Sequence, residues 1–481
     1  MSRHKRRREG ARTPLSPSAA QRALPPTPGA AAPPPRFGVV IQTRSFRALW
    51  LAQICAQLAQ NLTWITLGAY VASTASTGKN TLVAAITVSA LLAQLLLSGV
   101  AGVLVDRMST RRVLLRCNAV RVALTLLLLA ATRLDPALQL PTIILLIFVV
   151  NAVAQFFTPA EAATIPTLVE RPHLLAATSL FNITMSACQV IPIISGLLLL
   201  QLVGIGPILG GVAVLYAGAT ALVTTLPRAT SPSRGPQTGG SASAAARQVW
   251  AEVREALRFL AHDPGLQLTL FQVNVAPTFL FIFGTLGLTF VEQTFHLNPN
   301  RAWILLLPAG VGLVVGAVGV GRVVARRRME DVITLGLVGM GVGVTVLGTV
   351  AVVFGAAYRT AGRVGEIIAQ HGHRLPPVPN RLHNAGLIPP AMLIALGIGL
   401  AMALATIPAQ TLVLERTAPA VRGRVLALQQ LVGGALPILP LLTVAPLADL
   451  VGPSAVMTGL GVVIVLVGVL SGRLDQGRGV H

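Results

Sequence analysis

The sequence predicts an all-α, polytopic membrane protein with twelve transmembrane helices in two pseudo-symmetric six-helix halves. Three observations favour this class. Of the 481 residues, 53% are hydrophobic and only 11% are charged, against roughly 25% charged residues in an average soluble protein. The mean hydropathy is +0.73, and the apolar residues gather in runs that match the ~20-residue helices that cross a bilayer. A soluble enzyme would lack the charges to cover its surface, and an extended disordered chain would be less hydrophobic.

Twelve apolar segments of suitable length follow one another along the chain. In order they are 46–72, 81–104, 113–133, 141–157, 175–200, 207–226, 266–291, 302–322, 332–357, 387–412, 425–447 and 453–472. Several contain Gly and Pro, which membrane helices tolerate better than soluble helices do. The glycine repeat from Gly310 to Gly316 predicts close helix packing. Because the number of spans is even, both chain ends are expected on the same side of the membrane.

The basic residues predict which side that is. The chain has 37 Lys and Arg against 15 Asp and Glu, a formal net charge of +22. With the N-terminus inside, 29 of these 37 basic residues lie in segments on the inner side, which is the positive-inside asymmetry. We therefore predict a multi-pass protein of the cytoplasmic membrane with both termini cytoplasmic, and no nucleic-acid partner. The basic N-terminal cluster either binds anionic lipids or is a solvated tail that reinforces this orientation.

Composition also divides the chain into segments. We expect a disordered basic cytoplasmic tail over 1–44, an N-terminal half over 45–226, a cytoplasmic linker over 227–265, a C-terminal half over 266–472 and a short cytoplasmic tail over 473–481. The linker begins rich in Ser, Gly and Pro. From Arg247 to Ala261 its apolar residues share one face, which predicts an amphipathic helix on the membrane surface. Two six-span halves around such a linker are typical of pseudo-symmetric transporters.

A short motif follows the second span. Its sequence, Gly102-Val-Leu-Val-Asp106-Arg107-Met-Ser-Thr-Arg111-Arg112, resembles the G-x-x-x-D-R-x-G-R-R motif of the major facilitator superfamily. In that family the loop helps to close the inner gate, so the resemblance implies a gating role for these five named residues. An Asp at a helix end beside an Arg can form a contact that exists in one state only and so bias which side is open. The alternative is that these charges only fix the topology.

Three further stretches resemble one branch of that superfamily, the enterobactin exporters and macrolide-efflux permeases. They run from Phe156 to Pro166, from Ala256 to Pro264 and from Glu415 to Val425. The resemblance implies alternating access in the direction of efflux, with an antiport mechanism. One departure is Asn118, which stands where related exporters often carry an Asp.

Polar side chains repeat at helical spacing on several predicted spans. A polar group in hydrocarbon needs a partner or water, so a polar helix face indicates an interior path. The predicted path residues are Gln53, Gln57, Gln60, Asn61 and Trp64 of span one, Asn151 and Gln155 of span four, Asn182 and Gln189 of span five, and Phe271, Asn274 and Thr278 of span seven. The alternative is that these amides hold helices together. Neutral amides and aromatic rings suit a small amphipathic or largely apolar organic substrate.

We expect no cofactor and a proton gradient as the driving force. Two charged residues are candidates for coupling transport to that gradient. Arg121 lies within the third span and is either functional or extends toward the inner surface. A proton carrier needs a carboxylate that burial can keep protonated. None of the 15 acidic residues is expected at mid-membrane; Glu161 falls near an inner end, and Glu292, at the outer end of span seven, is the best candidate.

Other classes of function have less support in the sequence. The outer loop 358–386 carries His371, His373, His383 and Glu366, a set that can bind a metal, but its proline content favours a solvated insertion, and we expect no metal site. A membrane-embedded transferase would need clustered catalytic groups, so we expect no enzyme. Uptake of a metabolite and a non-transporting scaffold or sensor are the alternatives to efflux. We expect a monomer.

Overall fold

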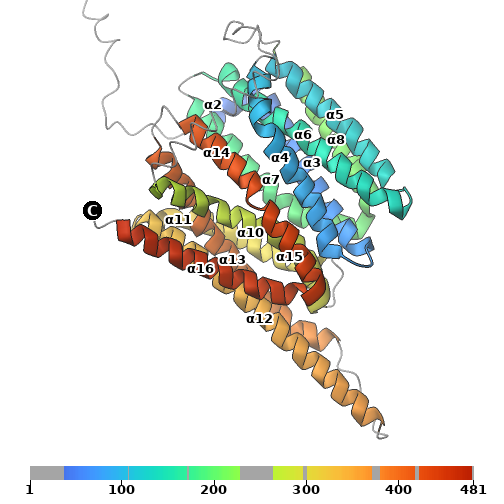
Figure 1. The fold of residues 1–481 in the computed structure, drawn as a ribbon. Helices are drawn as coiled ribbons and strands as arrows, with labels where there is room; N and C mark the ends of the chain where they lie inside the picture. The colour runs from blue at the N-terminus through green and yellow to red at the C-terminus, as the bar shows by residue number, and fades with distance from the viewer. Residues whose placement is uncertain are drawn as a thin grey trace, which may run out of the picture.

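The computed structural model is all-helical over the residues that it describes: 37–106, 108–170, 173–227, 264–295, 301–370, 380–417 and 422–478. The helices of the first half are α2 (Phe37–Gln42), α3 (Arg44–Thr74), α4 (Lys79–Asp106), α5 (Thr110–Ala131), α6 (Pro136–Leu168), α7 (Leu174–Val203) and α8 (Ile205–Thr224). Those of the second half are α10 (Pro264–Phe295), α11 (Trp303–Val324), α12 (Met329–Gln370), α13 (Asn380–Arg416), α14 (Arg422–Ala435), α15 (Ile438–Val451) and α16 (Pro453–Arg478). Figure 1 shows the two halves as neighbouring bundles.

Ten segments of the described chain are long and apolar enough to cross a membrane. They are α4, α5, α6, α8, α10, α11, α12, α13, the pair α14–α15, and α16. The other two predicted spans correspond to α3, with 31 residues, and α7, with 30 residues. These two helices pack against each other and against α8 in the same bundle. The all-α polytopic fold is therefore confirmed.

Helix contacts repeat between the two halves. In the first half α3 packs on α7 and α8, α4 on α6, and α5 on α6 and α8. In the second half α10 packs on α14, α15 and α16, α11 on α13, and α12 on α13 and α16. Each of these contacts in the first half has a counterpart in the second half, between the helices that lie six spans further along the chain. This repetition is the pseudo-symmetry expected of two related six-helix units.

The halves meet along a few helices. On one side of the interface α4 packs on α14 and α15; on the other, α7 packs on α11. Between them α10 contacts both α3 and α4. Because α4 corresponds to α11 and α7 to the pair α14–α15, the contacts on the two sides of the interface are pseudo-symmetric copies of each other.

Glycine allows unusually close packing in the second half. A Cβ built on Gly399 of α13 would lie 1.8 Å from the carbonyl oxygen of Ala309 in α11, and one built on Gly312 of α11 would lie 2.0 Å from that of Leu396. Contacts this short leave no room for any side chain. The prediction that the glycines around 310–316 serve helix packing is confirmed at Gly312 and Gly316.

Helical structure is described for part of the predicted N-terminal tail. Residues 1–44 were expected to be disordered throughout, but residues 37–42 form α2 and α3 starts at Arg44. Val40 of α2 is almost fully buried, since α2 packs on α3 and α7. The prediction for 37–44 is therefore wrong, because an apolar Phe-Gly-Val-Val-Ile run finds a surface to cover. Residues 1–36, and the linker with its expected amphipathic helix from Arg247 to Ala261, lie outside the described residues.

Three predicted boundaries also change. The fourth span was expected to end at 157, but α6 continues to Leu168 through an alanine-rich turn and so includes Glu161. The eleventh span is two helices rather than one, because Pro437 lacks the N–H that would continue α14. Residues 358–370 of the expected outer loop extend α12, and 380–386 begin α13; Figure 1 shows the extended α12 reaching beyond the bundle.

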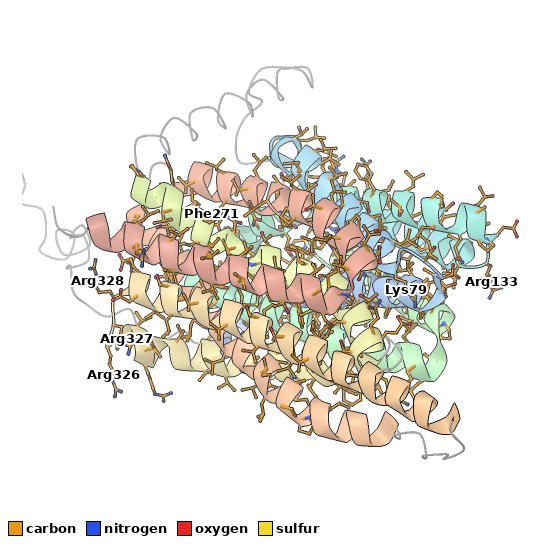
Figure 2. The ribbon with its side chains drawn as sticks, turned by 60° about the horizontal axis from the view of Figure 1, so that its bottom comes forward. Lys79, Arg133, Phe271, Arg326, Arg327 and Arg328 are labelled. Atoms are coloured by element: carbon orange, nitrogen blue, oxygen red, sulfur yellow. The ribbon has the colours of Figure 1, made fainter. Side chains whose placement is uncertain are left out.

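Basic residues mark the two ends of the bundle. Figure 2 shows Arg326, Arg327 and Arg328, between α11 and α12, at one end, and Lys79 and Arg133 at the other. This is the separation that the predicted topology requires, with the first group inside and the second outside. We refer below to the Lys79 end and the Arg326 end.

We predict that Gly399→Ala lowers the melting temperature of the purified protein by several degrees. The added methyl would meet the α11 backbone, and overpacking of this kind costs roughly 1–3 kcal/mol. The matched control is Gly397→Ala on the same helix, where a Cβ meets nothing within 4 Å. Equal melting curves for the two variants would show that the close α11–α13 contact does not limit stability.

Candidate functional site

Amide side chains of α3 and α6 meet within the first half. Gln60 donates from Nε2 to Oδ1 of Asn151 at 3.4 Å. Asn151 and Gln155 also donate to backbone carbonyls one turn earlier in α6. Gln57, Gln60 and Asn61 are each half-buried. The structure therefore brings together the path residues predicted on spans one and four.

The other predicted path residues fall in different surroundings. Gln53 is completely buried, and neither polar atom of its side chain finds a partner among the described residues. Asn274 and Thr278 of α10 are buried and donate to backbone oxygens of their own helix. Phe271 is 41% exposed. On α7, Gln189 is exposed, and the side chain of Asn182 lies outside the described part of the chain. The path prediction thus finds its clearest geometric support on α3 and α6.

Trp64 packs across the interface between the halves. Its ring lies edge-on to that of Phe281 in α10, with centroids 6.4 Å apart. A Cβ on Gly284 would come within 2.9 Å of Trp64 Cη2, so the indole fills the space that a side chain there would need. Beside it, α3, α4 and α10 enclose a cavity of about 10 Å³, room for about one water molecule. Trp64 therefore closes the interface at this level.

A cluster of polar contacts joins the halves at the Lys79 end. We call Lys79, Asn80, Thr81, Glu292 and Asp449 the clasp. Lys79 Nζ forms an ion pair with Glu292 Oε1 at 2.6 Å. Asn80 accepts a hydrogen bond from the hydroxyl of Thr289 in α10. The start of α4 is thereby tied to the end of α10.

Asp449 of α15 caps the N-terminus of α4. One carboxylate oxygen accepts from the backbone N–H and the side-chain amide of Asn80, at 3.0 and 2.9 Å. The other accepts from the N–H and the hydroxyl of Thr81, at 3.0 and 2.6 Å. The first N–H groups of a helix lack partners within it, and the helix dipole favours an anion there. An acid of the second half therefore completes a helix of the first half.

Sequence reasoning did not find this contact. Residues 80 and 449 are 369 positions apart, and no local pattern joins them. Glu292 was predicted as a coupling residue, and the structure places it in the clasp, half-exposed beside Lys79. Its role in coupling stays a prediction.

The loop motif lies at the Arg326 end. Arg111 donates from Nη2 to the carbonyl oxygen of Thr224 at 2.6 Å, which joins the start of α5 to the end of α8. Arg112 donates to the hydroxyl of Ser109. Gly102 lies in α4, and a Cβ there would meet nothing within 4 Å. Arg107 and the side chain of Asp106 lie outside the described residues, so the gating contact stays a prediction.

Arg416 makes a related set of contacts in the second half. It pairs with Glu330 at 2.8 Å and donates to the hydroxyl of Thr269 at 2.7 Å. The end of α13 is thus joined to the starts of α12 and α10. The sequence motif around Glu415 marked this stretch, but it did not indicate the partner of Arg416.

Arg121 is buried rather than extended to the surface. Only 2% of its area is exposed, and its guanidinium carbon lies 4.9 Å from the ring centre of Phe157 and 5.5 Å from that of Tyr216. The alternative that Arg121 reaches the inner surface is therefore wrong. Two aromatic rings hold its charge inside the first half. Among the described residues no cluster of His, Cys, Asp or Glu could hold a metal.

Two related six-helix bundles joined by polar contacts are typical of the class of pseudo-symmetric membrane transporters. The chain belongs to the Major Facilitator Superfamily, whose family model matches residues 49–369. That match covers more than half of the chain, from α3 in the first half to α12 in the second.

Solved structures show the same fold at low sequence identity. A variant of the nucleoside transporter NupG superimposes with a TM-score of 0.63 at 15% identity, covering 89% of this chain and 99% of that one. A D-xylose-proton symporter superimposes with a TM-score of 0.62 at 14% identity, covering 90% of this chain and 97% of that one. None of the curated proteins matches the sequence.

We predict that Asp449→Asn loosens the clasp. Asn keeps the size of the side chain but removes the charge at the α4 N-terminus, an interaction that contributes about 0.3–2 kcal/mol. In a Leu288→Cys background, where the thiol would line the small cavity beside Trp64, maleimide labelling should accelerate roughly 2- to 30-fold.

The control for this measurement is Asp135→Asn, which removes the same charge from the exposed residue that precedes α6. Its labelling rate should equal that of the Leu288→Cys parent. If Asp449→Asn also labels at the parental rate, the carboxylate does not hold the Lys79 end closed.

Proposed function

We propose that this protein is a secondary active transporter that exports a small amphipathic or largely apolar organic molecule across the cytoplasmic membrane, driven by the proton gradient. The observation that carries this proposal is the uncharged character of two helices of the first half, α3 and α6, and of two of the second, α10 and α13; we call these four helices the seam. The central parts of α3, α6, α10 and α13, over 48–74, 137–160, 264–291 and 388–414, contain no charged residue. They instead present amides beside Trp64 and Phe281. Such a surface favours a solute with apolar bulk and a few polar atoms.

The orientation follows from the basic residues. With the Arg326 end in the cytoplasm, as the positive-inside rule requires, the clasp faces outside. The structure then represents a state closed to the outside, in which Trp64 lies beneath the closed clasp. Alternating access requires that the clasp opens when the Arg326 end closes.

Export, rather than uptake, is supported by the resemblance of three stretches to the enterobactin-exporter and macrolide-efflux branch. Uptake of a hydroxylated metabolite is the second candidate, because the amide cluster of Gln57, Gln60 and Asn151 can equally pair with hydroxyl groups. The two candidates predict opposite changes in cellular content of the substrate.

We predict that cells producing the protein accumulate less ethidium, a cationic amphipathic dye, than cells with an empty vector, and that a proton uncoupler abolishes the difference. Gln57→Leu should reduce this export several-fold, because an amide of the seam is lost while its volume is kept. Gln201→Leu, at the exposed end of α7, makes the same change away from the seam and should leave export unchanged.

A panel of amphipathic dyes and radiolabelled sugars and nucleosides separates the outcomes. Net accumulation of a polar metabolite would replace export by uptake. Neither export nor uptake of any compound, with the protein correctly inserted in the membrane, would favour the scaffold alternative.

A further inference from the structure

A buried polar cluster lies inside the first half, away from the seam. It consists of Asn118 and Arg121 of α5, Glu161 of α6 and Tyr216 of α8. All four side chains are at least nine-tenths buried: Glu161 is 5% exposed, Arg121 is 2% exposed and the other two are completely covered. The cluster therefore combines an acid and a base in the low-dielectric interior of a membrane bundle.

Several polar atoms of the cluster have no partner among the described residues. They are Oε1 of Glu161, Nε of Arg121, both amide atoms of Asn118 and the hydroxyl of Tyr216. A buried polar atom without a hydrogen bond is costly, and a buried unpaired charge costs far more. A carboxyl group in this position escapes most of that cost when it takes up a proton and becomes neutral.

The described contacts of the Arg121 guanidinium are with aromatic rings and not with an acid. Its guanidinium lies over the rings of Phe157 and Tyr216, and within the described chain no ion pair closer than 4.0 Å joins it to an acid. Phe157 precedes Glu161 by one turn of α6, so the guanidinium lies on the face of α6 that carries the carboxyl group. A positive charge on that face favours the ionised form of the acid. Burial and Arg121 thus oppose each other at the carboxyl group, so that a small movement of either helix can change which form is favoured.

Few other titratable groups face Glu161 from the neighbouring helices. Among the helices that pack on α6, α5 contributes Arg121 and the thiol of Cys117 and also carries Arg111, Arg112 and Arg116 in its first two turns. Helix α3 carries Arg44 and Arg47 at its exposed start, with Cys55 and Tyr70 further along, and α7 carries the thiol of Cys188 but no charge. On α4, Lys79 lies at the other end, and the side chain of Asp106 is outside the described residues. Tyr216 reaches the cluster from α8.

Helix α6 links this cluster to the seam. Gln155 lies six residues before Glu161 and donates to the backbone oxygen of Asn151, whose side chain is bonded to Gln60 of α3. Between them, Pro159 has no N–H to bond the carbonyl oxygen of Gln155, which weakens α6 at that turn. A change in the charge of Glu161 can therefore move one part of α6 against the part that carries the path amides.

We propose that Glu161 is the proton-binding group of this transporter and that Arg121 is its counter-charge. The proton adds to a carboxylate oxygen of Glu161, which changes from an anion to a neutral acid. It returns to water when α5 and α6 move apart and expose the carboxyl group. The use of this site in coupling rests on the proposed export function, whereas proton binding itself does not.

The first test measures protonation without any substrate. Full-length protein in lipid nanodiscs is titrated from acid to alkaline buffer, and the infrared C=O stretch of protonated carboxyl groups is recorded. Glu161→Gln should remove one buried carboxyl signal, Glu161→Asp should retain it at a shifted frequency, and Arg121→Lys should change the pH at which it titrates. Glu292→Gln, which lies in the clasp, should leave it in place.

Infrared spectra of Glu161→Gln that overlay those of the wild type would overturn the proposal. So would a signal in Glu161→Asp that does not shift, a readout that holds even if the Gln variant fails to fold. A purely structural role for the pair would change stability but not the titrating signal.

The second test measures coupling through ethidium export. Glu161→Gln should lose the uncoupler-sensitive export and keep exchange of ethidium down its own gradient. If the wild type does not move ethidium while the infrared signal behaves as expected, the proposed substrate class fails and the proton site stands. Uncoupler-sensitive export that persists in Glu161→Gln would overturn the coupling role.

Discussion

The cost of placing a charge in hydrocarbon is the constraint on which this structure depends. Each buried or half-buried charge that the structure describes meets it in a distinct way. Lys79 and Glu292 pair at one end of the bundle, and Arg416 and Glu330 pair in the second half. Arg121 lies against two aromatic rings. Glu161 has no ion pair among the described residues, and its Oε1 has no hydrogen-bond partner there, which is why we assign it a proton.

The two halves repeat the same helix contacts but hold them together by different means. In the second half, Gly312, Gly316 and Gly399 allow α11 and α13 to approach until their backbones touch, so packing rather than polarity stabilises the pair. In the first half, α5, α6 and α8 surround Arg121 and Glu161 instead. A glycine-packed half is suited to move as a rigid body, whereas a half with a titratable centre has a means to change its packing.

How much the sequence could predict depended on how local each interaction is. The span positions follow from composition and helical period within about twenty residues, and the helices lie there apart from the changed boundaries of α6, α12 and the pair α14–α15. The same period predicted the amides of α3 and α6, of which Gln60 and Asn151 are within hydrogen-bond distance. The capping of α4 by Asp449 could not be predicted, since it joins residues 369 positions apart across two halves. The burial of Glu161 was missed for a related reason. The predicted span ended before Pro159, whereas α6 continues to Leu168, and only the packing of α5 shows which face of α6 is covered.

The clasp and the Glu161 cluster lie toward opposite ends of the same half, and α4 connects them. Its first residues are held by Asp449 of the second half, its length packs on α6, and its last residues enter the loop motif that precedes Arg111. A helix of 28 residues transmits a displacement of one end to the other because its backbone hydrogen bonds resist shortening. Release of Asp449 would therefore free α4 to move against α6, the helix that carries Glu161. Protonation of Glu161 and closure of the clasp then both act on the packing of α4 against α6. The two events can be coupled in alternating access through this helix pair.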